Sequence, residues 1–478
     1  SATRATFNSA FPIVVNGTLR IKGCDFTLNS YATSWLNCGI YIGPNGKLIV
    51  EDGTFRSTKG SYIFGHEFGK RPDITIHGGR FEGYDPSDND FDGNGSNYLE
   101  PEYASYYVAE NELVVAERTA EWEVDNSYLL NSILKNGGNA TLIDSVHDDW
   151  VFNVDNNINV NYPVNISVSG DSSKVSGECI LYIDTPINCY ADVNIKCDYT
   201  YGDIAADSYA PDTKLLYIDS TTAIANVYNG ATLTLGDATY FGGSDEVSET
   251  LFNLYGGNIV VNDGSYTLSE RINAANMFVV NPRYAEESSL VVNGGVFYGY
   301  NPESVAFGEE VKNCVPEGKG ALLSWDGGHY TIKNKGTFTA ASYNVDGLPS
   351  VINSDGPGSS GTTTLGNRIN GENWDIVTFQ ENFEYRSNLY DAITNYTIGT
   401  DRGGLNYGSA LVGGVSKTDG LGFATLSSTT SFSGETFVKF NAAYGGLFDG
   451  ANTCIEKGFR YYLVTLASGA QIDVYITH

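Results

Sequence analysis

Asn229-Gly-Ala-Thr-Leu-Thr-Leu-Gly-Asp-Ala-Thr-Tyr240 and Gly256-Gly-Asn-Ile-Val-Val-Asn-Asp-Gly-Ser-Tyr266 share one order of residue types. Each stretch begins at an Asn-Gly or Gly-Gly turn, continues with alternating apolar residues, turns again at Asp or Gly, and ends on an aromatic residue. Alternation with a period of two places every second side chain on one face of a strand. Gly, Asn and Asp supply the positive φ that tight corners need. Each stretch therefore predicts short strands joined at a tight corner.

The same order recurs through the first 335 residues, at 16–26, 45–55, 73–81 and 289–297. Neighbouring copies lie about 26 to 31 residues apart, a spacing typical of stacked repeats. One such unit cannot bury its own apolar face, but a stack of units can. We therefore predict a β-solenoid. A β-sandwich of ordinary hairpins would explain the turns but not their recurring order.

A longer duplication divides this region into two blocks. Residues 78–87 are echoed by 294–303, and each copy is followed by an acidic loop and a Pro-Glu pair. We therefore expect solenoid blocks at 1–115 and 116–335 that end in the same closing module. Between them, apolar residues at 128, 129, 130, 133 and 134 predict one short helix, with Asp125 or Asn126 as N-cap and Gly137 as its stop. Such a helix would cap the first turn of the second block.

These segments resemble the right-handed β-helix, pectin-lyase-like modules of secreted bacterial proteins and of phage or viral surface proteins. Polysaccharide lyases on that fold need clustered acidic metal ligands and an Arg or Lys base on one face. No such group repeats in register here, and His66, His77, His147 and His329 are scattered. A polysaccharide-processing solenoid is therefore the third choice among the functions considered.

The composition restricts partners and location. The 478 residues carry a formal net charge of −30, and only 18% of them are charged. A chain this acidic repels nucleic-acid backbones and anionic membranes, so bulk nucleic-acid binding is not expected. No apolar run is long enough to span a bilayer. With 55 Gly, 33 Tyr and one Met, the composition favours an extracellular or surface-exposed all-β protein.

The cysteines and glycosylation triplets add further expectations. None of the seven cysteines forms a Cys-x-x-Cys pair, so no structural zinc site is predicted. Cys24 could pair with Cys38, and two of Cys179, Cys189 and Cys197 could pair with each other. Asn-x-Ser/Thr acceptors occur at Asn16, Asn94, Asn139, Asn165 and Asn395.

Asp88, Asp90 and Asp92, followed by Gly93, match the opening of a calcium loop. A full loop would have Glu at its twelfth position, where Leu99 stands, and Glu100 comes one residue later. The alternatives are a structural Ca²⁺ and a solvated acidic loop.

The sequence pattern changes at about residue 336. A buried strand is predicted to end at the polar turn around Asn344, and another at Glu381. Residues 457–466 and 472–478 read as a hairpin that ends in His478.

Five motifs follow one another in this third of the chain: Tyr-Asn-Val-x-Gly-Leu-Pro at 343–349, Asp-Ile-Val-x-x-Gln-Glu at 375–381, Phe-Asp-Gly at 448–450, Lys-Gly-Phe at 457–459 and Val-Tyr-x-Thr-His at 474–478. In this order they resemble the endonuclease/exonuclease/phosphatase superfamily, especially its secreted sphingomyelinase-like members. The resemblance implies that Asn344 and Glu381 hold Mg²⁺ or another divalent cation and that His478 contacts the scissile phosphate. In the plain alternative, Asn344 caps a turn and Glu381 is a surface carboxylate.

The chain departs from this family in two ways. Residues 443–447 lack the Cys that secreted relatives place upstream of the one matched by Cys454. The sequence also ends at His478, before the family's Asp-x-Asn and Ser-Asp-His segments, which supply the general-base His. A positioned base contributes about 10²–10⁴-fold in rate. We therefore expect no appreciable hydrolysis from these 478 residues, which would be either a fragment of a longer enzyme or a structural remnant.

The expected fold is mainly β, with two right-handed β-helix blocks followed by an incomplete α/β-sandwich at 336–478. The leading function is a secreted or surface β-helix scaffold that carries a metal-dependent phosphodiesterase-like domain, attached to a cell surface or polymer. The alternative is a structural or adhesive subunit of an extracellular filament, appendage or virion that assembles with copies of itself.

Overall fold

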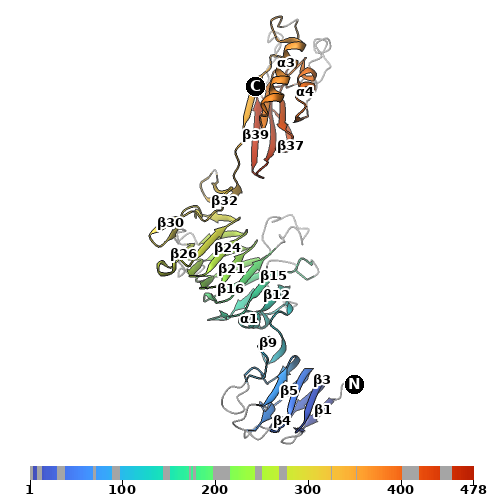
Figure 1. The fold of residues 1–478 in the computed structure, drawn as a ribbon, viewed down its shortest axis with the longest axis vertical. Helices are drawn as coiled ribbons and strands as arrows, with labels where there is room; N and C mark the ends of the chain where they lie inside the picture. Colours follow the sequence, from blue (N-terminus) through green and yellow to red (C-terminus); the bar gives the residue numbers. More distant parts are fainter. Residues whose placement is uncertain are drawn as a thin grey trace. The chain divides into compact units, whose positions relative to one another are not determined.

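The alternating stretches pair side by side as strands in the computed structural model (Figure 1). The structure describes residues 4–7, 13–29, 38–67, 72–88, 97–143, 151–171, 174–175, 179–197, 216–242, 250–268, 277–324, 326–350, 353–400, 419–441 and 455–478.

The first block contains two sheets in its described part. One has the order β1-β3-β5-β8-β10-β9, with β7 also beside β5, and the other has the order β2-β4-β6. The strands are β1 (Arg4–Phe7), β2 (Ile13–Val15), β3 (Thr18–Leu28), β4 (Cys38–Ile42), β5 (Lys47–Ser57), β6 (Tyr62–His66), β7 (Asp73–Ile76), β8 (Gly79–Glu82), β9 (Tyr103–Ala109) and β10 (Glu112–Glu117).

The second block is a three-sided parallel solenoid, whose successive turns are stacked in Figure 1. Its first sheet contains β11 (Glu121–Val124), β12 (Gly138–Leu142), β15 (Val164–Val168), β18 (Val193–Lys196), β21 (Thr232–Leu235), β24 (Asn258–Val261) and β27 (Ser289–Val292). Its second sheet contains β13 (Val151–Val154), β16 (Cys179–Ile183), β19 (Leu216–Ser220), β22 (Thr239–Gly242), β25 (Ser265–Leu268), β28 (Val296–Tyr298), β32 (His329–Asn334) and β31 (Lys319–Leu323).

The third sheet contains β14 (Asn159–Val160), β17 (Ile187–Cys189), β20 (Ala225–Tyr228), β23 (Phe252–Tyr255), β26 (Phe278–Val280), β29 (Val305–Phe307) and β30 (Glu310–Lys312). A short 3₁₀ helix, η2 (Pro282–Tyr284), follows β26. Over the two blocks the described strands make about nine turns, so the predicted β-solenoid is confirmed.

The aromatic residue that ends each copy of the motif is buried in the core of the solenoid, among aliphatic side chains. Phe55 and Phe81 stack with ring centroids 5.0 Å apart. Tyr266 lies 4.7 Å from Tyr240 and 4.8 Å from Phe297 in the same way. All five side chains are buried. Because neighbouring turns bury these rings against one another, each turn is stabilised by its neighbours, as expected for a solenoid.

Both blocks end in the same arrangement, as the duplicated sequence predicts. In the first block β10 pairs antiparallel with β8, the last parallel strand, and β9 lies outside β10. In the second block β32 pairs antiparallel with β28, and β31 lies outside β32. An antiparallel hairpin therefore closes each stack.

Helix α1 (Ser127–Asn136) lies where the second block begins and confirms the predicted helix. The side chain of Asn126 caps its N-terminus by accepting a hydrogen bond from the backbone N–H of Leu129, and Gly137 is its C-cap. Its buried face packs in the same core cluster as Tyr106 of β9, whose hydroxyl donates to the carbonyl of Gly137 at 2.9 Å.

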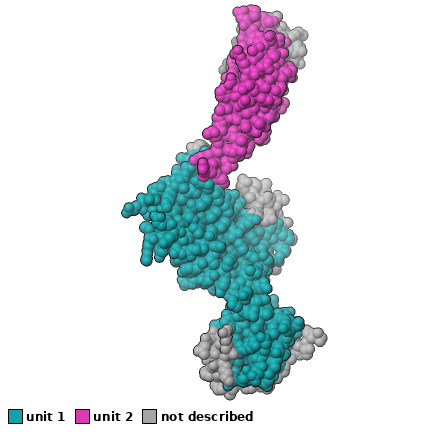
Figure 2. All heavy atoms as spheres, viewed as in Figure 1, with its two compact units in different colours: residues 1–316, 321–332 teal, residues 317–320, 333–478 magenta. Residues whose placement is uncertain are grey.

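The described residues divide into two compact units, Ser1–Pro316 with Ala321–Ile332, and Glu317–Gly320 with Lys333–His478 (Figure 2). The division into three domains at 1–115, 116–335 and 336–478 stays a prediction.

The second unit, called here the C-terminal unit, combines two small sheets with two helices. One sheet has the order β33-β34-β36-β35 and the other β37-β38-β39. The elements are β33 (Ala340–Asn344), α3 (Gly358–Glu372), β34 (Ile376–Gln380), α4 (Arg386–Ala392), β35 (Tyr396–Ile398), β36 (Gly422–Leu426), β37 (Thr430–Lys439), β38 (Gly458–Leu466) and β39 (Gln471–Thr477). One core cluster joins α3 and α4 to the first sheet, and a second joins the two sheets. The superfamily assignment of this unit remains a prediction.

The suggested disulfides of the solenoid are not present in the structure. None of Cys24, Cys38, Cys179, Cys189 and Cys197 is in a disulfide, and all except Cys24 are buried. Burial raises the pKa of Cys38 and of Cys189 to about 12, so these thiols stay protonated at neutral pH. The cysteines serve as small apolar side chains in the core.

Candidate functional site

Two polar side chains of the C-terminal unit lie at the ends of neighbouring parallel strands. β33 and β34 pair in parallel, with helix α3 between them in the chain, and Asn344 lies opposite Gln380 in the register. Glu381 is the next residue after β34. The carboxyl ends of parallel strands form one edge of a sheet, where ligands of α/β folds bind. Asn344 and Glu381 therefore lie at the same edge.

His478 lies close to Glu381. Its Nε2 is 3.6 Å from Glu381 Oε1, and the two side chains are 41% and 23% exposed. This contact joins the residue after β39, in one sheet, to the residue after β34, in the other. Residues 344, 381 and 478, which the sequence resemblance named as site residues, thus lie at neighbouring strand ends, in solvent-accessible positions.

The backbone at these strand ends adopts a conformation that most residues avoid. Among the described non-glycine residues, positive φ occurs at Asn157, Asp346, Asn373 and Glu381. Asn and Asp tolerate the left-handed region, but Glu rarely adopts it. Glu381 has φ 56°, and Asp346 after β33 has φ 44°. Strain of this kind persists only where surrounding contacts hold it, and it is common at functional sites.

Hydrogen bonds hold the strained segment in place. The carbonyl of Glu381 accepts from the backbone N–H of Gly347 at 3.0 Å and of Phe383 at 3.0 Å. The N–H of Asn382 donates to the carbonyl of Gly420 at 2.9 Å. The side-chain oxygen of Asn344 accepts from the N–H of Asp346 at 3.0 Å. These bonds connect the turn after β33, the turn after β34 and the start of β36.

The donors at this edge suit a hard cation that keeps most of its water. Glu381 offers a carboxylate and Asn344 an amide oxygen, and Mg²⁺ is commonly bound by one or two such groups with waters completing its shell. Within the described residues, no group of three or more His, Cys, Asp and Glu side chains is arranged to enclose a metal. An open Mg²⁺ site fits these residues, and a closed protein cage does not.

Other predicted positions are placed as follows. Asp88 is exposed, whereas Asp90, Asp92 and Asn94 lie outside the described residues, so the calcium loop stays a prediction. The motif at 448–450 and Cys454 also lie outside them. Asn16, Asn165 and Asn395 are exposed. Asn139 is half-buried, and its amide donates to Glu121 Oε1 at 2.8 Å.

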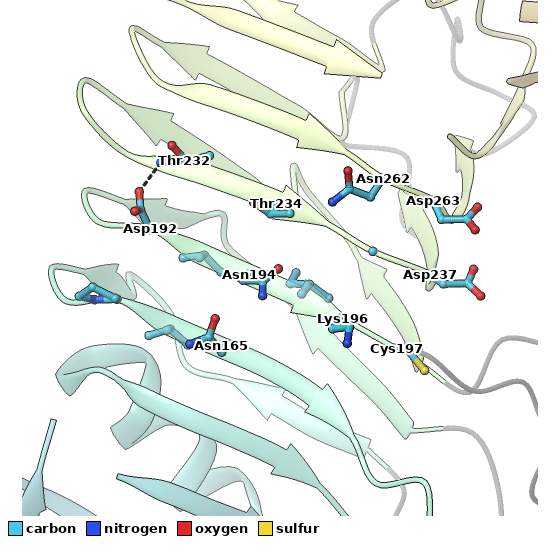
Figure 3. A pocket seen from close by; sticks show the side chains of 15 residues that line it. Asn165, Asp192, Asn194, Lys196, Cys197, Thr232, Thr234, Asp237, Asn262 and Asp263 are labelled. Carbon is cyan, nitrogen blue, oxygen red and sulfur yellow. Dashed lines mark hydrogen bonds between the residues drawn. The ribbon is translucent and has the colours of Figure 1, made fainter. Parts of the chain in front are cut away.

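A second candidate site, which the motifs did not reveal, is a hollow on the outer face of the first sheet of the second block (Figure 3). It has a volume of about 970 Å³ and adjoins a second hollow of about 450 Å³, with which it shares Asn165, Asn194 and Lys196. Together they form one groove along β12, β15, β18 and β21, which we call the sheet groove. Figure 3 shows side chains of the larger hollow, among them Asn165, Asn194 and Thr234, on successive strands of the stack.

Polar, mostly uncharged groups line the sheet groove. Asn194, Thr232 and Thr234 contribute amides and hydroxyls from its floor. Asp192, whose carboxylate accepts from the N–H of Thr232 at 2.8 Å, lies at one edge. Lys196 is the basic member of the described lining, beside acidic Asp192, Asp237 and Asp263. The sequence carries a signal for this groove, because the outward position of each repeated strand is often Asn, Ser or Thr.

No protein-family model matches this chain, and a search of curated proteins found no match. Within the described residues, no helix is both long and apolar enough to cross a membrane.

Proposed function

We propose that the C-terminal unit recognises phosphodiesters with the help of a divalent cation and that the β-solenoid carries it. The observation that supports this most directly is the contact of 3.6 Å between His478 Nε2 and Glu381 Oε1, beside Asn344 at the same sheet edge. A left-handed Glu at a partly exposed strand end also supports the proposal, because strained backbone of this kind is common at functional sites.

In this proposal Glu381 and Asn344 hold a Mg²⁺ ion, which would neutralise charge on a phosphoryl oxygen. The backbone bonds around Glu381 fix the turn that carries its carboxylate, and the bond from the N–H of Asp346 fixes the side-chain oxygen of Asn344. This order before the ligand arrives lowers the cost of binding. His478 donates a hydrogen bond from its ring to a phosphate oxygen. His478 is the only histidine among residues 336–478, so no second imidazole of this region can act as general base. We therefore expect residues 336–478, by themselves, to bind with little turnover.

Replacing Glu381 tests the metal site. We expect the full chain to bind Mn²⁺, used as a probe for Mg²⁺, in calorimetric titration, and Glu381→Gln to lower the affinity at least about 10-fold because the charged ligand is lost. Glu384→Gln is the matched control, because Glu384 is exposed and lies three residues away. Bis(4-nitrophenyl) phosphate should bind only when Mn²⁺ is present. A wild-type chain that binds no Mn²⁺, or an E381Q chain that binds it equally well, would contradict the proposal.

A second candidate function follows from the sheet groove: attachment of the protein to a hydroxyl-rich polymer. Amides and hydroxyls on successive strands offer donors and acceptors about 4.8 Å apart, which suits an extended chain with regularly spaced hydroxyl groups. With one Lys among several Asp side chains, the lining favours a neutral glycan over an acidic one. An extracellular location belongs to this proposal and rests on composition.

Obstructing the groove tests the attachment. Thr234 lies in the lining, and Thr234→Tyr places a ring over the floor. We expect neutral polysaccharides such as galactomannan or xyloglucan to retard the wild-type chain in affinity electrophoresis. The Thr234→Tyr variant should bind the same polysaccharides at least about 10-fold more weakly. Thr267→Tyr, at an outward position of β25 in the second sheet, serves as control. Equal retardation of both variants, or stronger retardation by polygalacturonate than by neutral polymers, would contradict the assignment.

A further inference from the structure

A buried ion-pair network in the C-terminal unit is linked by hydrogen bonds to the strand-end site. The guanidinium of Arg460 in β38 is 3% exposed and the carboxylate of Asp419 is 0% exposed. Arg460 Nε donates to Asp419 Oδ2 at 2.9 Å, and Nη2 donates to Oδ1 at 3.3 Å, which makes a two-pronged contact. Nη1 donates to Glu435 Oε1 at 3.0 Å and also to the carbonyl of Thr400. Removing one partner of such a pair leaves the other charge buried without a partner, which is strongly destabilising.

The network is fully connected. Tyr462 OH donates to Glu435 Oε1 at 2.7 Å, and the other oxygen of Glu435 accepts from the N–H of Thr400 at 2.8 Å. Burial acts to lower the pKa of Arg460, but hydrogen bonds to Asp419 and Tyr462 outweigh it, so the pKa lies above its ordinary value. Arg460 therefore stays charged, and its contacts hold residues 400 and 419 against β37 and β38.

The contacts of Asp419 continue to Glu381. Asp419 Oδ1 accepts from the N–H of Leu421 at 2.9 Å, which fixes the backbone around Gly420. The carbonyl of Gly420 accepts from the N–H of Asn382, the residue after Glu381. A side chain at 420 would collide with the ring of Phe383, since a Cβ there would overlap the ring atoms. The segment 419–421 is thus fitted closely against the turn that carries Glu381.

We propose that the Arg460–Asp419 pair positions Glu381. The pair holds the carbonyl of Gly420 in place, and this carbonyl accepts the N–H of Asn382. That bond keeps Glu381 in its left-handed conformation, facing His478. The inference rests on the proposed function, because it takes Glu381 to be the metal ligand. Arg460 and Asp419 do not touch the ligand and are positioning residues. Outer partners of this kind are commonly worth 10–100-fold in metal affinity.

The test uses the full chain and two readouts. Asp419→Asn keeps an acceptor for the N–H of Leu421 but loses the charge that Arg460 pairs with. We expect its Mn²⁺ affinity to fall about 10–100-fold, while the far-UV circular dichroism is unchanged. Without metal, the amide of Asn382 should exchange with solvent at least about 10-fold faster, while the core amide of Val377 in β34 is unchanged. Arg460→Lys keeps the positive charge but not the two-pronged contact, so it should lose less Mn²⁺ affinity than Arg460→Met.

Lys439→Met is the matched control, because Lys439 ends β37 in the same sheet, is 64% exposed and pairs with Glu456 away from Arg460. A D419N chain that is folded, binds Mn²⁺ as wild type does and keeps Asn382 protected would overturn the positioning role and leave the metal site standing. A wild-type chain that binds no Mn²⁺ would overturn both. If D419N does not fold, Arg460→Lys decides by the same two readouts, and unchanged values overturn the inference.

Discussion

Gly264 shows at the scale of one residue why the repeated motif carries Gly before its aromatic ring. Its φ is +114°, and a Cβ built there would lie 2.8 Å from the ring of Tyr240 and 2.9 Å from the carbonyl of Ala238. The corner and the stacked ring of the previous turn therefore both exclude a side chain. Gly295, with φ +105°, occupies the same place in the following turn.

Gly264→Ala should destabilise the solenoid by roughly 2–4 kcal/mol, because the backbone strain and the steric clash add. Gly17→Ala serves as control, since Gly17 has ordinary φ and a Cβ at that position would meet no atom within 4 Å. We expect that variant to match wild type or to be slightly more stable. The midpoint of urea unfolding measures both. Equal midpoints for the two variants would show that the corner tolerates a side chain.

The same scale shows what the sequence can and cannot reveal about the site. Asn344, Glu381 and His478 stand in short motifs, so a family resemblance is enough to name them. Arg460 and Asp419 are 41 residues apart and belong to none of those motifs. Only the folded chain shows that both are buried, because burial of a charged residue depends on a partner that sequence spacing does not specify.

At the scale of elements, an amide ladder runs along the outer face of the third sheet. Asn188 Nδ2 donates to Asn159 Oδ1 at 3.0 Å, Asn226 Nδ2 to Asn188 Oδ1 at 3.0 Å, and Asn253 Nδ2 to Asn226 Oδ1 at 2.9 Å. These residues share register positions on β14, β17, β20 and β23. The ladder therefore couples consecutive turns from outside, as the aromatic stack does from inside.

The ladder predicts unequal costs for equal substitutions. Asn226→Ala removes two hydrogen bonds, whereas Asn159→Ala, at the end of the ladder, removes one. At about 0.5–1.5 kcal/mol for each bond, the first change should cost about twice as much as the second. Urea unfolding with unchanged slopes would measure this difference. Equal costs would mean that the amides bond to water as well as to each other.

The sequence predicts the stacking of the solenoid turns better than it predicts which side chains meet within the core and on the outer faces. The spacing of turns and the alternation of apolar residues are enough for strands, corners and stacking, and the capping of α1 by Asn126 follows from local hydrogen bonding. The pairing of cysteines does not follow from spacing, because Cys179, Cys189 and Cys197 fill separate core positions and form no disulfide. The groove could not be predicted either, because the turns differ in length and the sequence alone does not show which strands lie side by side.

At the scale of the whole molecule, a charge of −30 is combined with a core rich in buried phenols. Burial raises the pKa of Tyr240 and Tyr266 well above 10, and nearby acidic groups add to this shift. Burial raises the pKa of Tyr106 to about 12. These hydroxyls donate to carbonyls, Tyr240 to Gly236 and Tyr266 to Asp263, so each ring is held in its neutral form.

These shifts set the pH at which the solenoid should unfold. In the unfolded chain a tyrosine ionises near pH 10, whereas in the folded chain these buried tyrosines remain neutral. A folded pKa above the unfolded one contributes stability that is fully present below about pH 10 and is lost as the pH rises further. Because ionisation also adds negative charge to an already acidic chain, repulsion acts in the same direction. We expect cooperative unfolding above about pH 10.

Tyrosinate absorbance and far-UV circular dichroism, followed together through an alkaline titration, measure this transition. Exposed phenols should ionise first with no loss of structure, and the buried ones only as the β signal disappears. Tyr266→Phe removes one buried ionisable group, so the free energy of unfolding should fall less steeply with pH above about 10, by roughly one proton in the slope. Tyr190→Phe, at a position 49% exposed, is the control. If all the phenols ionise while the β signal persists, the aromatic stack is open to solvent and does not couple the turns.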